Sequence, residues 1–110
     1  MSLVVDSSAV MAIVLAEPDA ERLAERLAAC DQAIMSAVTL VETTIVAEAR
    51  LGAVGTTLVQ RVVREADIRT VDVTTETALD ALDGWRAYGK GHHRAALNLG
   101  DCFTYALARR

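Results

Sequence analysis

The sequence contains no hydrophobic stretch long enough to cross a membrane. Its longest apolar run extends from Ala9 to Ala16, whereas a transmembrane helix needs about 20 residues. The run is also a poor secretion signal, because Asp6 precedes it and no Lys or Arg occurs before Arg22. We therefore expect a cytoplasmic protein without a membrane partner.

Cysteine and several well-known motifs are also scarce or missing. The two cysteines, Cys30 and Cys102, lie in helical apolar patterns, so we expect reduced core residues and no disulfide. No Cys–His grouping has the spacing of a zinc site. Walker loops, glycine-rich dinucleotide loops and Ser-His-Asp or Cys-His arrangements are missing too. These absences disfavour zinc proteins, nucleotide-binding folds and hydrolases with a Ser or Cys nucleophile.

The bulk composition fits one compact domain. The chain has 110 residues, 53% of them hydrophobic, and contains no linker, low-complexity segment or repeat, so we expect a single domain over residues 1–110. The net charge is −4. Overall charge therefore does not attract nucleic acid, and any such binding must depend on a local basic patch.

Short apolar strands alternate with helical patterns along the chain. We expect strands at Leu3–Asp6, Ala33–Met35 and Arg69–Val73. The first expected helix extends to Leu15 with Ser7 or Ser8 as its cap, and the second has Pro18 in its first turn and Ala20, Leu23 and Leu27 on its apolar face. The third extends from Ala37 to Leu51, with Ser36 as its cap and Gly52 at its end. The remaining helices are expected at Thr56–Ala66, at Thr75–Tyr88 and, with Asn98 as cap, at Leu99–Arg109. This order predicts an α/β sandwich with a short parallel sheet in which helix dominates. Functional sites of such folds gather at the carboxyl ends of the strands.

Asp6 is the first of three carboxylates in unusual positions, because it ends the first expected strand. It is either a metal ligand or a helix N-cap, a position that aspartate fills well. Ser7 and Ser8 follow it and are better placed as caps. The cap therefore does not require Asp6.

Glu42 lies within an apolar segment. At about 100° per residue, Val38, Ile45, Val46 and Ala49 lie within about 60° of it on the helix. Neither Glu48 nor Arg50 shares that face. Glu42 is therefore either a functional carboxylate or a glutamate bound by a buried Arg or by backbone N–H groups elsewhere.

Asp101 follows Asn98 by three residues and lies in the first turn of the last expected helix. Acids in that position complement the helix dipole, so Asp101 alone would be a capping residue. It points largely away from the expected apolar face, which is formed by Leu99, Cys102, Phe103 and Ala106. A functional role for Asp101 is therefore expected only if Asp6 and Glu42 belong to the same site.

Three carboxylates on different elements suit Mg²⁺ or Mn²⁺, with room left for water ligands. Such a metal activates water for attack on phosphorus and stabilises the leaving oxygen. A phosphohydrolase acting on small phosphate esters is an alternative. An aspartyl nucleophile of that class would want an acid two residues after Asp6, where Ser8 stands.

A run of basic side chains precedes Asp101. It comprises Arg86, Lys90, His92, His93 and Arg94. Tyr88 adds a flat ring that can stack on a base. The segment is either a clamp for an RNA backbone beside the metal or a solvated surface loop.

These residues carry a resemblance to PIN-domain ribonucleases of the VapC type, the toxins of VapBC toxin–antitoxin pairs. The similar motifs are Val4-Val5-Asp6-Ser7-Ser8-Ala9, Ser36 to Glu42 followed by Thr43-Thr44, Tyr88-Gly89-Lys90-Gly91-His92, and Leu97-Asn98-Leu99-Gly100-Asp101-Cys102-Phe103. Together they span essentially the whole chain.

The resemblance implies a sheet flanked by helices, with Asp6, Glu42 and Asp101 catalytic around Mg²⁺ or Mn²⁺. It also implies cleavage of structured RNA such as tRNA or rRNA, a homodimer, and a VapB-type antitoxin whose tail enters the acidic groove. Ser7, Lys90, His92 and Arg94 are the expected substrate contacts.

Family members usually continue with further strands and a fourth acid, which this sequence does not contain after Arg110. A truncated, inactive domain that binds antitoxin or RNA therefore stays an alternative. Such a domain would also leave an edge of the sheet exposed beside the first strand.

Overall fold

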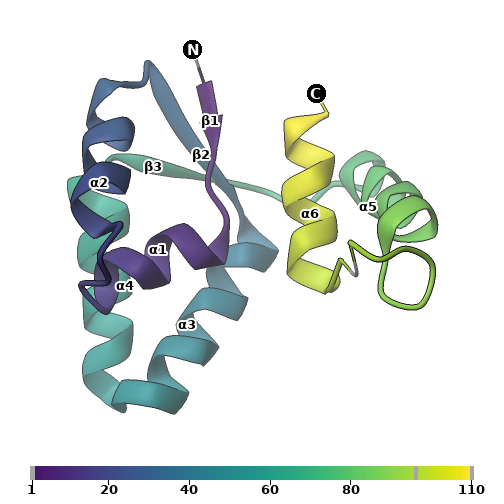
Figure 1. Ribbon diagram of the computed structural model, residues 1–110. Helices are drawn as coiled ribbons and strands as arrows, with labels where there is room; N and C mark the ends of the chain where they lie inside the picture. Colours follow the sequence, from purple (N-terminus) through teal and green to yellow (C-terminus); the bar gives the residue numbers. More distant parts are fainter. Residues whose placement is uncertain (1, 96, 110) are drawn as a thin grey trace.

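A computed structural model describes residues 2–95 and 97–109. Within these residues the chain forms a small sheet surrounded by helices (Figure 1). The elements in chain order are β1 (Ser2–Val4), α1 (Ser7–Val14), α2 (Ala20–Ala29), β2 (Gln32–Ser36), α3 (Ala37–Leu51), α4 (Ala53–Glu65), β3 (Ile68–Val71), α5 (Thr75–Tyr88) and α6 (Leu99–Ala108). None of the described helices is long and apolar enough to span a bilayer.

The sheet has the strand order β1-β2-β3, and both pairs of neighbours are parallel. Val4 lies opposite Ile34, and Ser36 lies opposite Val71. Each strand is followed by a helix, as parallel connections require. The carboxyl ends of the strands consequently meet at one edge, where α1 and α3 begin.

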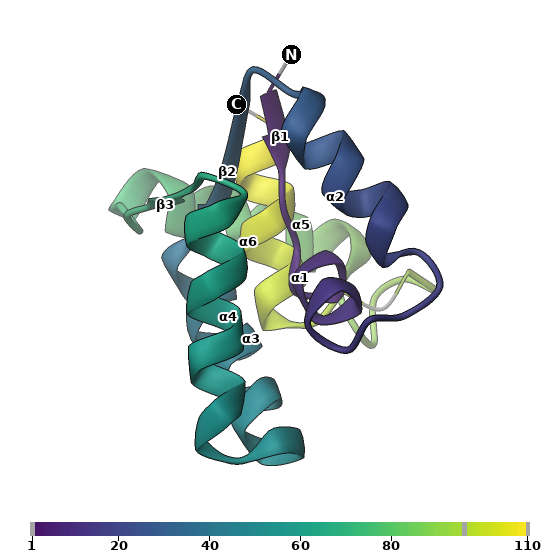
Figure 2. The ribbon, with the colours of Figure 1, turned by 90° about the vertical axis from the view of Figure 1, so that its left-hand side faces the viewer.

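Helices cover both faces of the sheet. Figures 1 and 2 show α1, α2 and α4 on one side and α5 and α6 on the other. The larger apolar cluster lies on the first side and contains Val10, Met35, Val59 and Ile68, among others. A smaller cluster of Ala81, Cys102 and Ala106 joins α5 to α6. The expected helix-dominated α/β sandwich is confirmed.

Two close approaches between helices depend on glycine. A Cβ on Gly84 would overlap the ring of Tyr105, so α5 can lie against α6 only because this position has no side chain. A Cβ on Gly55 would overlap the Ala47 backbone, which explains the tight contact between α3 and α4. Gly84 thus favours the packing of α5 at the expense of helix propensity.

The helices α3 and α5 match the sequence-based expectation at both ends. All three strands have shifted bounds, and β1 and β3 end two residues early, so Asp6 follows the first strand instead of ending it. Two helices begin elsewhere. α2 starts at Ala20, so Pro18 lies in the preceding turn, which Ala16 enters with a positive φ of 51°. α4 starts at Ala53 instead of Thr56, because Gly52, with φ 71°, both ends α3 and begins α4.

Candidate functional site

Glu42 lies in the second turn of α3, which starts where β2 ends. The Ser36 side chain caps this helix by accepting a hydrogen bond from the Val38 N–H at 3.1 Å. The half-buried Glu42 carboxylate accepts a hydrogen bond from Ser7 Oγ at 3.4 Å. On another side it lies against Gly100, where an added Cβ would be 2.6 Å from the carboxylate carbon. Glu42 is therefore enclosed between the first turns of α1 and α6.

Asp6 stands directly before α1 and is the N-cap of that helix. Its Oδ1 accepts hydrogen bonds from the Ala9 N–H at 3.0 Å and from Ser8 Oγ at 2.8 Å. The prediction that a serine would cap this helix was wrong, because Ser7 and Ser8 already belong to its first turn. Among the described residues, Oδ2 of Asp6 accepts no hydrogen bond and stays available.

Asp101 occupies the first turn of α6 and forms a capping box with Asn98. Asp101 Oδ2 accepts a hydrogen bond from the Asn98 N–H at 3.1 Å, and Asn98 Oδ1 accepts one from the Asp101 N–H at 2.9 Å. The capping role expected for both residues is confirmed. Leu99, in contrast, is 70% exposed. The prediction that it belongs to the apolar face of this helix was therefore wrong.

The apolar stripe expected around Glu42 is present, but much of it faces outward. Ile45 is 62% exposed and Val46 is 39% exposed. The buried side of α3 is instead formed by Thr39, Thr43 and Ala47. Their small side chains let α4 and α6 approach closely, and the Thr43 hydroxyl is satisfied because it donates to the Thr39 carbonyl at 2.7 Å. Glu42 thus lies at the border of the core.

None of the three acids has a basic side chain as partner within residues 2–95 and 97–109. The ion pairs found there join Asp19 to Arg22, Glu65 to Arg61, and Asp83 to Arg86 and Arg109. The alternative in which a buried Arg neutralises Glu42 is therefore not realised in the described chain. The partial positive charges at the first turns of α1 and α6 are the local source of compensation.

The negative charge near α6 also affects a thiol. Burial raises the pKa of the Cys102 thiol, and the carboxylate of neighbouring Asp101 raises it further. Cys102 is 3% exposed and Cys30 is half-buried, and both are free thiols, as the sequence indicated. The thiol form of Cys102 is an apolar filler of the contact between α5 and α6.

The donor chemistry of the three acids fits a hard divalent cation, since carboxylate oxygens are the ligands that Mg²⁺ and Mn²⁺ prefer. Asp6 and Asp101 each use one carboxylate oxygen for the start of their helix, and no described residue donates a hydrogen bond to the other oxygen. As the side chains stand, however, no group of three His, Cys, Asp or Glu residues in the described chain is arranged to hold a metal. Binding would require the carboxylates to turn toward one another, at a cost of about 1 kcal/mol for each cap that is lost.

Four residues were expected to contact substrate. Ser7 binds Glu42, and the other three lie on the loop between α5 and α6. Lys90, His92 and Arg94 are exposed. The loop is closed by backbone hydrogen bonds from Lys90 N to Leu97 O at 3.1 Å and from Leu97 N to Tyr88 O at 3.0 Å. Its end is thus fixed one residue before Asn98, the cap of the helix that carries Asp101.

Comparison with known proteins identifies the family. The PIN domain family matches residues 3–110. The chain belongs to the PIN domain family. It is 43% identical to "Ribonuclease VapC" of Mycolicibacterium smegmatis over 97% of this chain and 83% of that protein. It is 44% identical to "Ribonuclease VapC36" of Mycobacterium tuberculosis over 97% of this chain and 78% of that protein. The resemblance to PIN-domain proteins of the VapC type is confirmed.

Gly100 is a part of the candidate site that the sequence did not predict. Its position in the first turn of a helix is nevertheless a signal of close approach, because glycine lets another group come near the backbone. The neighbour that requires this glycine is Glu42, which is distant in sequence. The partner could therefore not be named from spacing alone.

The contact between Gly100 and Glu42 gives a prediction about stability. In the wild-type background, Gly100→Ala should lower the free energy of unfolding by about 1–3 kcal/mol, because the new methyl group overlaps the carboxylate. In a Glu42→Ala background the same change should stabilise by up to about 1 kcal/mol, because alanine is the better helix former. Urea unfolding of the four proteins measures this double-mutant cycle.

Leu99→Ala in the same turn is the control for that cycle and should have equal effects in both backgrounds. An equal effect of Gly100→Ala with and without the Glu42 carboxylate would contradict the packing described here.

Proposed function

We propose that this PIN-domain protein is a metal-dependent endoribonuclease and the toxin of a type II toxin–antitoxin pair. The observation that carries the proposal is the position of Glu42 between the first turns of α1 and α6. Asp6 caps the first of these turns, and Asp101 belongs to the capping box of the second. Three acids without a basic partner in the described chain are thereby brought to the carboxyl edge of the sheet, where α/β proteins place their sites.

In this proposal Asp6, Glu42 and Asp101 hold Mg²⁺ or Mn²⁺. The bound metal supplies an activated water and stabilises the leaving oxygen of the cleaved phosphodiester. Asp6 and Asp101 would turn from their present capping positions to reach the metal, and Glu42 is oriented by Ser7. Structured RNA such as tRNA or rRNA is the proposed substrate. The printed names of the VapC relatives, which say ribonuclease, support RNA as the kind of molecule that is cleaved.

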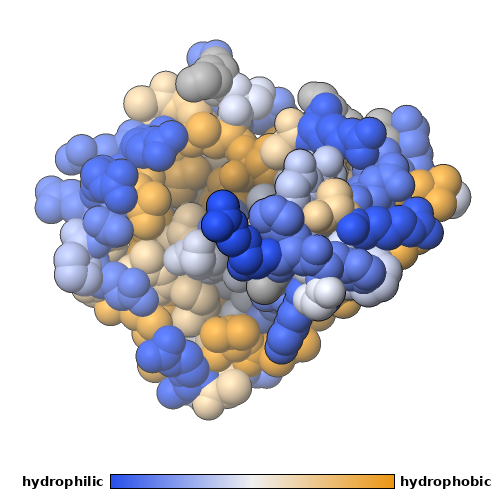
Figure 3. Space-filling view, turned by 45° about the vertical axis from the view of Figure 1, so that its right-hand side comes forward, coloured by the Kyte–Doolittle hydropathy of each residue, from blue (hydrophilic) through white to orange (hydrophobic). Residues whose placement is uncertain are grey.

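The basic loop supplies the proposed contacts to the RNA backbone. Lys90 and Arg94 are exposed and have no ion-pair partner among the described residues. Figure 3 shows that hydrophilic side chains predominate on the side of the molecule that carries α5 and α6. A local concentration of basic groups is what an acidic protein with a net charge of −4 needs in order to hold a polyanion.

Removal of single carboxylates tests the proposed activity. With Mg²⁺ or Mn²⁺ present, we expect a loss of RNA cleavage of about 100-fold or more in each of three variants, Asp6→Asn, Glu42→Gln and Asp101→Asn. Even the loss of a residue that only hydrogen-bonds to a metal ligand lowers metal affinity or activity by about 10- to 100-fold. The matched controls are Glu48→Gln on the exposed side of α3 and Asp72→Asn in an exposed loop. Both should cleave as the wild type does.

Three outcomes would contradict the proposal. Unchanged cleavage by Glu42→Gln would remove the assigned site. RNA binding without metal-stimulated turnover would favour the inactive binding module. Turnover of a small phosphate ester with none on RNA would favour a phosphohydrolase.

A homodimer is part of the same proposal. The outward stripe of α3, formed by Val41, Ile45 and Val46, is an exposed apolar surface of the kind that a second copy covers. Ile45→Glu should convert the dimer to a monomer in analytical ultracentrifugation, because a charge would be buried in the interface. Val73→Glu, at an exposed valine outside α3, should leave the assembly unchanged. A dimer that persists in Ile45→Glu would exclude this face.

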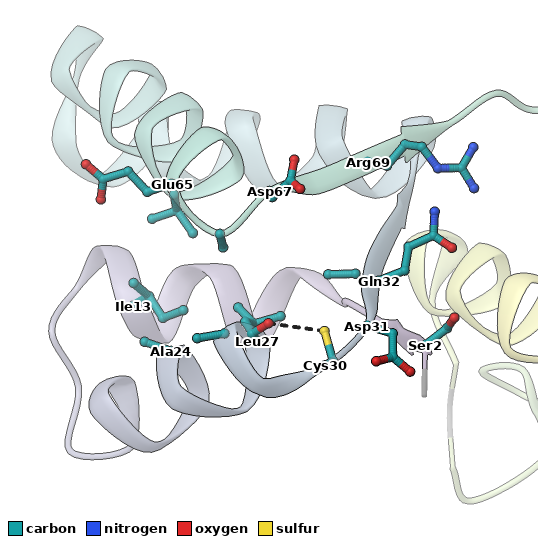
Figure 4. A pocket seen from close by; sticks show the side chains of 14 residues that line it. Ser2, Ile13, Ala24, Leu27, Cys30, Asp31, Gln32, Glu65, Asp67 and Arg69 are labelled. Carbon is teal, nitrogen blue, oxygen red and sulfur yellow. Dashed lines mark hydrogen bonds between the residues drawn. The ribbon is translucent and has the colours of Figure 1, made fainter.

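A VapB-type antitoxin is the other proposed partner. A groove of about 1000 Å³ lies between α2, α4 and the start of β2, and Ile13, Leu27 and Val62 are among its lining residues (Figure 4). Asp31, Glu65 and Arg69 also line this groove, and a groove with both apolar and charged side chains suits an amphipathic protein segment. The tail of the antitoxin would extend to the three carboxylates. An equimolar antitoxin that fails to suppress RNA cleavage would contradict this assignment.

A further inference from the structure

Most rings of this chain gather at one place. The sequence has four aromatic residues and two histidines, and five of these six rings lie at the end of α5, in the following loop and on the adjoining side of α6. The centroids of Trp85 and His92 are 4.3 Å apart, with the rings at 79°. Tyr88 and His93 are 5.3 Å apart at 82°, and Tyr88 also contacts Tyr105 at 5.8 Å. Such edge-to-face contacts are favourable and hold each ring in a defined orientation.

Trp85 and Tyr88 are in contact with the backbone and with neighbouring rings, and both are partly exposed to solvent. Trp85 lies so close to Gly89 that a Cβ there would overlap the indole, and this places the indole directly over the backbone. The amides of His92 and His93 both donate to the Gly89 carbonyl, at 2.9 and 3.0 Å. Trp85 is nevertheless 42% exposed and Tyr88 41% exposed. Trp85 and Tyr88 therefore form an aromatic surface that is supported by ring and backbone contacts and remains open to solvent.

This surface is linked to the acidic site through the backbone. The hydrogen bonds between Tyr88, Lys90 and Leu97 close the loop at its base, and Asn98 then starts α6. Figure 1 shows this loop beside the first turn of α6, the turn that contains Gly100 and Asp101. The exposed charges of Lys90 and Arg94 lie on the same loop. Rings and basic groups therefore occur together close to the proposed cleavage site.

We propose that Trp85 and Tyr88, held by His92 and His93, stack on unpaired bases of the RNA. This inference rests on the proposed function and assigns to Trp85 and Tyr88 the contacts with RNA bases that are not paired. Aromatic side chains stack on any base, but only on bases that have left a duplex. Lys90 and Arg94 bind the adjoining phosphates, which both single-stranded and duplex RNA possess.

Binding can be tested without cleavage by using the Glu42→Gln variant in a buffer without divalent metal. The probes are a fluorescent single-stranded ten-nucleotide RNA and the same strand annealed to its complement. Trp85→Leu and Tyr88→Leu should each weaken binding of the single strand by about 5- to 150-fold, the loss of one base stack, and leave duplex binding unchanged. Lys90→Gln and Arg94→Gln should weaken both probes and reduce the salt dependence.

The matched control is Leu79→Ala, at an exposed leucine on the same helix, and it should have no effect on either probe. Tyr88→Phe retains the ring and should retain the affinity, which separates stacking from a loss of folding. Since Trp85 is the only tryptophan, its fluorescence should be quenched by the single strand and not by the duplex. Equal weakening of both probes by Trp85→Leu, or no quenching, would overturn the inference.

The outcomes also distinguish this inference from the proposed function. If Trp85→Leu binds and cleaves unpaired RNA as the wild type does, stacking is overturned and metal-dependent cleavage stands. If the carboxylate variants cleave normally while Trp85→Leu loses affinity for the single strand, the metal assignment falls and stacking stands.

Discussion

The close contact between the Glu42 carboxylate and the backbone of Gly100 is the constraint on which the site depends. It brings the first turn of α6 against α3, while the hydrogen bond from Ser7 brings in the first turn of α1. Asp6 is the N-cap of α1, and Asp101 forms a capping box with Asn98, the N-cap of α6, so the interactions that start these helices also position the two acids. Three like charges beside a core are unfavourable without compensation. Two helix N-termini supply part of that compensation, and a divalent cation would supply the rest.

Different surface features lie on the two sides of the sheet. The larger apolar cluster and the groove of Figure 4 belong to the side of α1, α2 and α4. The aromatic and basic loop belongs to the side of α5 and α6. The acids lie where both sides meet, at the carboxyl edge. In the proposed function, a protein partner and an RNA would therefore reach the same site from different faces.

The sequence predicted the fold class, the strand order along the chain and most helix ends, because caps and breakers such as Ser36, Gly52 and Asn98 act locally. It also singled out the three acids, which lie directly before α1, on α3 and in the first turn of α6. It was wrong about the cap of α1, where Asp6 and not a neighbouring serine starts the helix. It was also wrong about Leu99, which is exposed. Packing decides both the residue that caps α1 and the side of α6 that is buried. It could not reveal that Gly100 contacts Glu42 or that Trp85 lies over Gly89, because both contacts require the folded backbone.

The central claim is that Asp6, Glu42 and Asp101 act as one divalent-metal site. Calorimetric titration of Mn²⁺ into the wild type and into each single carboxylate variant, with Glu48→Gln as control, tests it most directly. We expect binding in the wild type and in the control, and a loss of affinity of about 10-fold or more in each of the three variants. Equal Mn²⁺ affinity in all five proteins, or no binding in any, would contradict the account.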